Sequence, residues 1–152
     1  QAEDGIRDRS PSRGLGDVYK RQVLMVGGAR FPPNKWQGDP SHPVGSSEIY
    51  NPSDGSLSTS VSMATPREYH SAILLKNGDV LIVGGISMES YNPGAKIWTE
   101  IGELIHERDQ MHTATMLNDG RIVIAGGRME TDDKKIRSLS AVEIYDPSAV
   151  KE

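Results

Sequence analysis

The sequence predicts an all-β chain built from repeated antiparallel sheets, and three observations lead to this prediction. Two segments, His70–Gly85 and His112–Gly127, align without a gap at a constant offset of 42 residues. In each, an Asn-Gly or Asp-Gly pair separates two apolar runs, which is a strong short-range signal for a two-residue type I′ hairpin turn. Runs that favour helix are scarce, while the 152-residue chain contains 16 glycines.

A third, partial copy extends the repeat toward the N-terminus. The segment Val23–Gly28 matches the end of the two longer copies, and a Tyr-Asn-Pro or Tyr-Asp-Pro follows each copy. The distance from the second glycine to this tyrosine is 22, 6 and 18 residues in the three copies. The length variation thus falls in one loop, as expected of a rigid repeat with one tolerant connection. The glycine pairs are Gly27-Gly28, Gly84-Gly85 and Gly126-Gly127, and the tyrosines are Tyr50, Tyr91 and Tyr145.

Each copy is expected to form four strands, because the turn signals divide it into short β-type runs. The three repeats occupy about 23–63, 64–104 and 105–152. Strand one is expected at 70–75 and 112–117, strand two at 79–84 and 121–126, strand three before each tyrosine, and strand four at 56–62 and 97–101. A four-stranded sheet of this kind cannot bury both faces alone, so the repeats must stack radially as the blades of a propeller.

The ordered markers resemble the kelch repeat. A Gly-Gly pair is followed by a Tyr, then by Trp98, and then by Arg67 or Arg108 ahead of the next strand one. The resemblance covers Val23 to Glu152 and implies a partial kelch-type β-propeller, with about two nearly complete four-stranded blades and part of another, taken from a ring of six or seven. The first copy departs from the pattern, since Leu57 stands where the second copy has Trp98.

Residues 1–22 have a different character from the rest of the chain. They show no apolar periodicity, and Gln1–Asp8 and Ser12–Gln22 resemble the translated constant parts of a transposase-type sequencing-library adapter. Arg9–Pro11 then fill the place of the variable index. We therefore expect this segment to be adapter-derived and disordered, and the gene to continue upstream of Val23. The alternative is a natural disordered, charged arm.

Composition excludes several function classes. The formal net charge of −4 weighs against nucleic-acid binding, which requires a basic surface. No apolar run has the length that spans a membrane, and the chain contains no cysteine, so it forms no disulfides.

The strand order predicts which face binds a ligand. In a four-stranded meander, strand one starts on the face where strand two ends, so the loops 29–45 and 128–138 lie on that face with the starts of strand one. Strand one is innermost in such propellers, which places these residues near the channel mouth, where ligands commonly bind. The candidate binding residues are Arg30, Trp36, Tyr69, His70, Met111, His112 and Arg128. We expect a non-catalytic module that binds a protein or carbohydrate ligand there, with no cofactor.

Recurrence favours a structural role for some of these residues. His70 and His112 occupy the same repeat position, and Arg67 and Arg108 are expected to act as clamps between blades through carboxylates or carbonyls.

An alternative function comes from a second resemblance. The segment Arg67–Leu75 resembles the Tyr-His-Ser segment of galactose oxidase and glyoxal oxidase, in which the tyrosine and histidine bind one copper ion. This implies Tyr69 and His70 as copper ligands of a copper-radical oxidase, and such side chains suit Cu(II). That family also requires a Cys–Tyr radical cofactor and a further histidine. A structural adhesion module is the third possibility, and the family resemblance favours an extracellular or periplasmic location.

Overall fold

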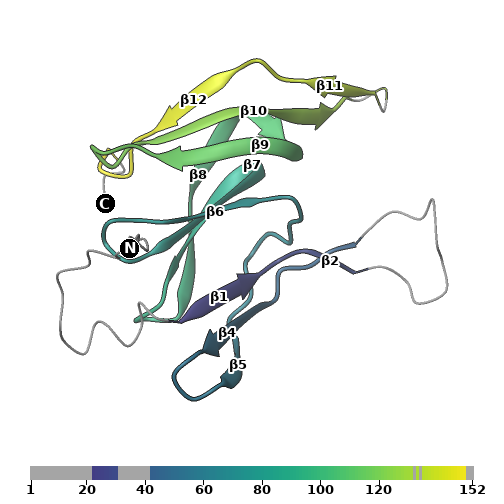
Figure 1. Ribbon diagram of the computed structural model, residues 1–152. Coiled ribbons are helices and arrows are strands. Elements are labelled where there is room, and N and C mark those ends of the chain that lie inside the picture. Colours follow the sequence, from purple (N-terminus) through teal and green to yellow (C-terminus); the bar gives the residue numbers. More distant parts are fainter. Residues whose placement is uncertain (1–21, 31–41, 132, 134, 150–152) are drawn as a thin grey trace, which may run out of the picture.

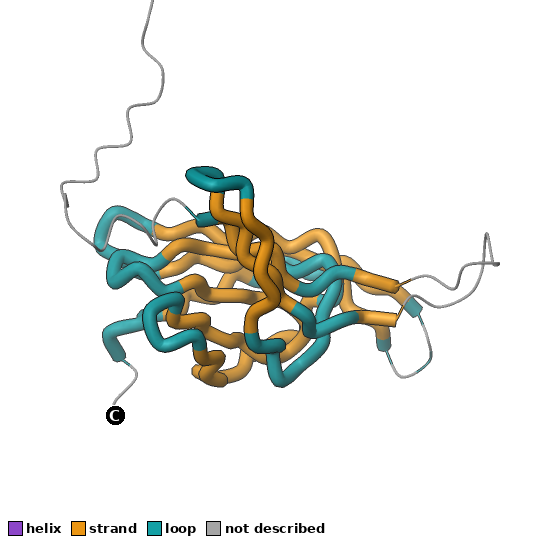
Figure 2. Tube along the Cα trace, turned by 90° about the horizontal axis from the view of Figure 1, so that it is seen from below, coloured by secondary structure: helices purple, strands orange, loops and turns teal. Residues whose placement is uncertain are grey.

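The computed structural model describes residues 22–30, 42–131, 133 and 135–149, and within them every regular element is a β-strand (Figure 1). The strands form antiparallel sheets that stack as successive blades, so the fold is a partial β-propeller, as the repeat predicted. In Figure 2 the strands are orange, and most loops and turns gather at the ends of the sheets. Among the described residues there is no helix that could cross a membrane.

The first blade contains three strands in the order β1-β4-β5, which span Val23–Val26, Ser47–Asn51 and Ser56–Ser60. The long connection after β1 begins and ends in a two-stranded ribbon of β2 (Ala29–Arg30) and β3 (His42–Pro43). These three strands correspond to strands two, three and four of the repeat. Within the described residues, this blade therefore has no inner strand.

The second blade is ordered β6-β7-β8, with β6 at Ser71–Leu74, β7 at Val80–Asn92 and β8 at Ile97–Arg108. Although β7 is one continuous element, it reverses direction near Gly85, whose φ is 66°.

Two hydrogen-bond patterns require this reversal. Asn92 Nδ2 donates to Asp79 Oδ1 at 2.9 Å, whereas a fully extended strand would separate these residues by about 40 Å. The guanidinium of Arg67 also bonds the carbonyls of Gly84 and Ser87 through one nitrogen. The arms 80–84 and 87–92 are thus the predicted strands two and three, and the second blade has four strands.

The third blade contains β9 (Gln110–Met116), β10 (Ile122–Glu130), β11 (Ile136–Ser138) and β12 (Val142–Tyr145). Strand β10 pairs with β9 on one side and with β11 and β12 on the other. After the glycine pair, the end of β10 pairs with the short β11, and this hairpin extends away from the blade.

The hairpin turns form where Asn-Gly and Asp-Gly predicted them, but the turn type differs from the predicted type I′. Gly78 has a φ of 93° and Gly120 one of 100°, whereas neither Asn77 nor Asp119 has the positive φ that type I′ requires. Instead, Gly78 N donates to Leu75 O, and Leu75 N donates to Asp79 O. This is a three-residue loop with glycine in a bulge, which also matches the twist of the flanking strands.

The hydrophobic core lies between the second and third blades. Leu81 and Val83, on one face of β7, pack with Ile122 and Ile124, on one face of β10, and all four side chains are fully buried. Because side chains alternate along a strand, each blade presents one apolar face to the preceding blade and the other to the following blade. The repeat therefore builds its core between sheets.

Candidate functional site

The linker between the first and second blades is fixed by Arg67. Its backbone bonds the first blade, since its N–H donates to Val44 O and its carbonyl accepts from Gly28 N. Its buried side chain bonds the second blade, where Nη2 contacts Glu89 Oε1 at 2.6 Å. The same carboxylate accepts the backbone N–H groups of Ala64 and Thr65. One arginine thus joins two blades through a fully satisfied carboxylate.

Arg108 makes the same connection between the second and third blades. It pairs with Gly85 in the second blade, and its side chain bonds Gly126 O, Ala141 O and Glu143 in the third. Burial would raise the pKa of Glu143, but hydrogen bonds from Ile105 N, Arg108 and His106 outweigh it and hold that pKa below its usual value. The carboxylate is therefore charged at neutral pH.

The two repeated histidines lie between blades. His112 is buried, and its Nε2 lies 3.0 Å from Val83 O of the preceding blade. His70 packs against Gly27 of its own preceding blade, where a Cβ would lie 2.7 Å from the imidazole Cε1. Burial lowers the pKa of both imidazoles, and the nearby positive charge of Arg67 or Arg108 adds to the effect. Both rings therefore favour the neutral form.

The residue before each histidine has an unusual backbone and an exposed side chain. Tyr69 has a φ of 55° and Met111 one of 59°, a region that costs a non-glycine residue about 1–2 kcal/mol. Tyr69 is 58% exposed and Met111 is 68% exposed. This repeated strain turns a large side chain outward at the start of the inner strand, where a ligand can reach it.

The outer aromatic residues bind the second blade to the first. Trp98 Nε1 donates to Val61 O at 2.8 Å, and the Tyr91 hydroxyl lies 2.8 Å from Ser60 Oγ. The two rings also contact one another, with centroids 4.9 Å apart. Of the three repeat tyrosines, Tyr91 is fully buried, Tyr145 packs against the core, and Tyr50 is partly exposed.

A cavity of about 290 Å³ opens on the face predicted to bind a ligand. It lies where the linkers before β6 and β9 meet the end of β10 and the start of β11; we call it the mouth cavity. Its polar lining comes from Glu68, Asp109, Gln110, Arg128 and Glu130, and its apolar lining includes Tyr69, Met129 and Ile136. Such a mixture of an exposed ring, a cation, carboxylates and an amide can stack on and hydrogen-bond an uncharged polar ligand.

The mouth cavity brings together only some of the predicted binding residues. Tyr69 and Arg128 line it, whereas His70 and His112 are directed between blades and Arg30 and Met111 lie outside its lining. Trp36 and residues 1–21 lie outside the described residues.

Sequence reasoning missed Asp109 and Gln110. Asp109 Oδ2 accepts the N–H of Glu130 at 2.8 Å, and its own N–H donates to Arg128 O at 2.8 Å. These bonds hold the end of β10 against the linker and so shape the cavity wall. The available signal was the extra residue between Arg108 and His112, compared with the spacing of Arg67 and His70.

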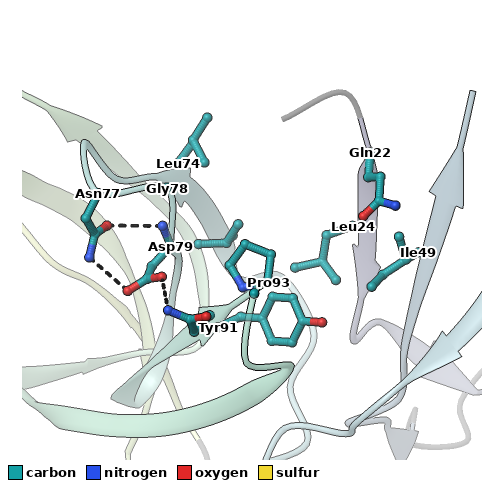
Figure 3. Close-up of a pocket in the computed structure, with 12 residues that line it drawn as sticks. Gln22, Leu24, Ile49, Leu74, Asn77, Gly78, Asp79, Tyr91 and Pro93 are labelled. Atoms are coloured by element: carbon teal, nitrogen blue, oxygen red, sulfur yellow. Dashed lines mark hydrogen bonds between the residues drawn. The ribbon is translucent and has the colours of Figure 1, made fainter. Parts of the chain in front are cut away.

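A second cavity, of about 370 Å³, lies between the first two blades at the opposite, hairpin-turn end. We call it the turn-side cavity. Leu24 and Ile49 of the first blade face Tyr91 and Pro93 of the second across it (Figure 3). Among the described residues, no group of three or more His, Cys, Asp or Glu side chains could hold a metal ion, in either cavity or elsewhere.

Comparison with known proteins supports the fold. No family model and no curated protein matches the chain. Among solved structures, it is similar to a fungal alcohol oxidase of the AA5 family in complex with copper, with a TM-score of 0.60 and 18% sequence identity. The similarity covers 86% of this chain but only 27% of the oxidase chain. At this identity, the likeness shows a shared fold.

Proposed function

We propose that the chain is part of a non-catalytic binding propeller that takes a protein or glycan partner at the mouth cavity. The observation that carries the proposal is the outward-facing Tyr69 at the edge of a cavity with polar groups from two linkers. An aromatic ring with few rotatable bonds gives large contact area at low entropic cost, and it suits both sugar and peptide surfaces.

The polar groups of the cavity supply selectivity in this proposal. Arg128 carries a permanent positive charge. Glu130 offers hydrogen-bond acceptors, and Gln110 offers both an acceptor and an amide donor. The Asp109 carboxylate accepts the Glu130 N–H and the Asp109 N–H donates to Arg128 O, so these two residues are held in place before a ligand arrives. Preformed sites lose little entropy on binding.

The experiment is a screen of the full chain against glycan and peptide arrays, followed by titration of each positive ligand. Tyr69→Ala should weaken binding about tenfold or more, because the ring supplies most of the apolar contact. Met111→Ala is the matched control, since Met111 has the same repeat position and positive φ but does not line the cavity. Equal losses for the two variants, or no ligand on any array, would contradict the proposal.

A copper-radical oxidase is the second candidate, favoured by the copper-bound oxidase among the structural neighbours. Tyr69 and His70 are the residues it would use. In this chain Tyr69 lines the mouth cavity while His70 packs against Gly27, so the two side chains do not form a copper site on their own. The candidate requires copper to bind the full-length protein and to be lost in Tyr69→Phe.

Kelch repeats and an extracellular or periplasmic location complete the proposal. The recurring order of Gly-Gly, Tyr, Trp and Arg supports the kelch assignment, and the shared fold with the fungal oxidase is compatible with it. A structural adhesion module would use the same blades without a mouth ligand. Reading the source DNA outward from the Gln22–Val23 junction tests these assignments. It shows whether residues 1–22 belong to the gene, and whether further repeats and a signal sequence are encoded upstream of Val23.

A further inference from the structure

The hairpin turn between β6 and β7 contains an asparagine whose chemistry the proposed function does not use. Asn77 is exposed, and Gly78 follows it. Asparagine is one of the chemically labile residues, because the next backbone nitrogen can attack its side-chain carbonyl carbon and close a five-membered ring. Glycine has no Cβ to hinder this approach. The pair therefore has the chemistry of a deamidation site.

The other asparagines among the described residues lack such a neighbour. Asn51 and Asn92 each precede a proline, whose nitrogen carries no hydrogen and cannot form the ring. Asn118 is exposed too, but Asp119 follows it and places a side chain beside the attacking nitrogen. Asn77 is thus the described asparagine best suited to react.

The folded turn holds both reacting groups in other bonds. Gly78 N donates to Leu75 O at 3.0 Å. The Asn77 side chain is fixed by Asp79, since Oδ1 accepts the Asp79 N–H at 3.1 Å and Nδ2 donates to Asp79 Oδ2 at 2.8 Å. The attack requires these bonds to break, so it can proceed only from an open form of the turn.

The equivalent turn of the third blade shows how a carboxylate is accommodated at this position. Asp119 occupies the repeat position of Asn77, and Arg121 occupies that of Asp79. The Asp119 carboxylate accepts the backbone N–H of Arg121 at 3.0 Å and its Nε–H at 2.9 Å, and this arginine holds the Asp119 pKa below its usual value. A cation two residues further on therefore stabilises a carboxylate in this turn.

In the second blade, the residue two positions further on is itself an acid. A carboxylate at position 77 would lack the amide donor that binds Asp79 Oδ2, and it would face a second negative charge there. Asp79 Oδ1 also accepts Asn92 Nδ2 at 2.9 Å, so the disturbance would reach the turn between β7 and β8. Asn77 further lines a cavity of about 290 Å³ together with Asp119 and Asp146, where the new charge would add to theirs.

We propose that Asn77 is a site of non-enzymatic deamidation, that opening of the turn sets its rate, and that the product loosens the turn. Hydroxide takes the proton from Gly78 N, which forms a bond to Asn77 Cγ. The Cγ–Nδ2 bond breaks, and the Nδ2 group takes a proton from water and leaves as ammonia. Water then opens the imide ring at either carbonyl and gives aspartate or isoaspartate, with no oxidation or reduction. The site lies at the opposite end of the blades from the mouth cavity and is independent of its function.

The first experiment follows the reaction itself. The full chain is incubated at mildly alkaline pH with and without denaturant, and peptide mass mapping measures the conversion of each asparagine. In denaturant, Asn77 should react at least about tenfold faster than Asn118, because glycine leaves the attacking nitrogen unhindered. In the folded chain, Asn77 should react at least about tenfold more slowly than in denaturant, because only the open turn reacts.

Variants at Asp79 separate opening of the turn from intrinsic reactivity. Asp79→Ala removes the acceptor of Asn77 Nδ2, and it should speed the reaction about threefold or more in the folded chain while leaving the rate in denaturant unchanged. Asp54→Ala is the matched control, since Asp54 accepts Asn51 Nδ2 in a turn of the first blade, and it should leave the rate at Asn77 unchanged. An equal rise for Asp79→Ala in denaturant would contradict control by the turn.

The effect of the product is tested with Asn77→Asp, which places a carboxylate beside Asp79. Leu75 N donates to Asp79 O at 2.8 Å, so hydrogen exchange of the Leu75 amide reports opening of the turn. Asn77→Asp should speed this exchange about threefold or more. Adding Asp79→Arg and Asn92→Asp copies the residues of the third blade and should restore the original rate.

Each of three results would overturn the proposal. Equal rates at Asn77 with and without denaturant would show that the turn does not control the reaction. Reaction of Asn118 as fast as Asn77 in denaturant would show that glycine does not select this site. Exchange at Leu75 that Asn77→Asp leaves unchanged would show that the product does not loosen the turn.

Discussion

The two interfaces between blades are built from the same repeat, yet they are filled to different extents. Between the second and third blades, the inner strand β6 brings Ile73 and Leu75 into a continuous core with Ile122. Between the first and second blades, a cavity of about 370 Å³ lies where those side chains would be. An arginine clamp is present at both interfaces, whereas an inner strand is described only at the interface between the second and third blades.

This comparison separates two kinds of contribution to stability. Hydrogen-bonded clamps depend on a few residues of the linker and of strand three, and they form wherever those residues occur. Apolar packing depends on every strand of a blade, because a missing strand removes one side of the contact. Clamps can thus hold two neighbouring blades in a defined orientation even where the apolar packing between those blades is incomplete.

The largest effects are expected at the clamps, where the two interfaces should behave alike. Arg67→Ala leaves Glu89 buried without its cation, and Arg108→Ala does the same to Glu143. Each should lower the free energy of unfolding by about 3–5 kcal/mol, measured by chemical denaturation. A loss below about 1 kcal/mol for one of the two would show that the clamps are not equivalent.

The apolar positions should reveal the difference between the interfaces. Leu81 and Leu24 occupy the same repeat position, but Leu81 is fully buried and Leu24 faces the turn-side cavity. Leu81→Ala should cost about 3 kcal/mol of unfolding free energy, and Leu24→Ala about 1 kcal/mol, because the latter removes few contacts. Similar costs would mean that both interfaces are packed alike in solution.

Acid should weaken both interfaces through the histidines. Burial lowers the pKa of His70 and His112 below the ordinary histidine value of about 6.5. As the pH falls below 6.5, the unfolded chain takes up protons that the folded chain does not, so stability decreases. His112→Gln keeps a donor for Val83 O and should reduce the slope of stability against pH between about 7 and 5. An unchanged slope in both His112→Gln and His70→Gln would contradict the burial of these rings.

The smallest effect is expected for a contact found only at the filled interface. Lys76 Nζ donates to Asn118 O, across from the second blade to the third, at an exposed position. Lys76→Met removes this bond and should cost about 0.5 kcal/mol or less. A loss of several kcal/mol would indicate that the inner strand is held by this lysine more than by its apolar side chains.

The repeat allowed most of the fold to be predicted. The apolar runs around Asn77-Gly78 and Asp119-Gly120 formed the expected hairpins, since local turn chemistry decides this feature. The turn type was wrong because φ of Asn77 depends on the twist of both strands. The tight reversal at Gly85 was implied by the gap of 6 residues, but the length of β8, which reaches Arg108, depends on pairing with Gly85.

The candidate site was harder to predict than the fold. The strand order placed Tyr69 and Arg128 on one face, and both line the mouth cavity. It could not show that His112 turns toward Val83, because the direction of a side chain depends on the neighbouring blade. Likewise, Asp109 shapes the cavity through bonds to Arg128 and Glu130. These contacts join segments about 20 residues apart, so they cannot be predicted from the local sequence.

Amide hydrogen exchange along the full chain tests the central claim most directly, namely that the interfaces differ because the first blade has no inner strand among its described residues. The arm 80–84 and the first half of β10 lie between two strands, while among the described residues β1 pairs with β4 alone. We predict slow exchange at Leu81, Ile82, Val123 and Ile124, and fast exchange at alternate amides of 23–26. Equal, slow exchange throughout β1 in dilute protein would contradict the account, because it would require a strand on that edge.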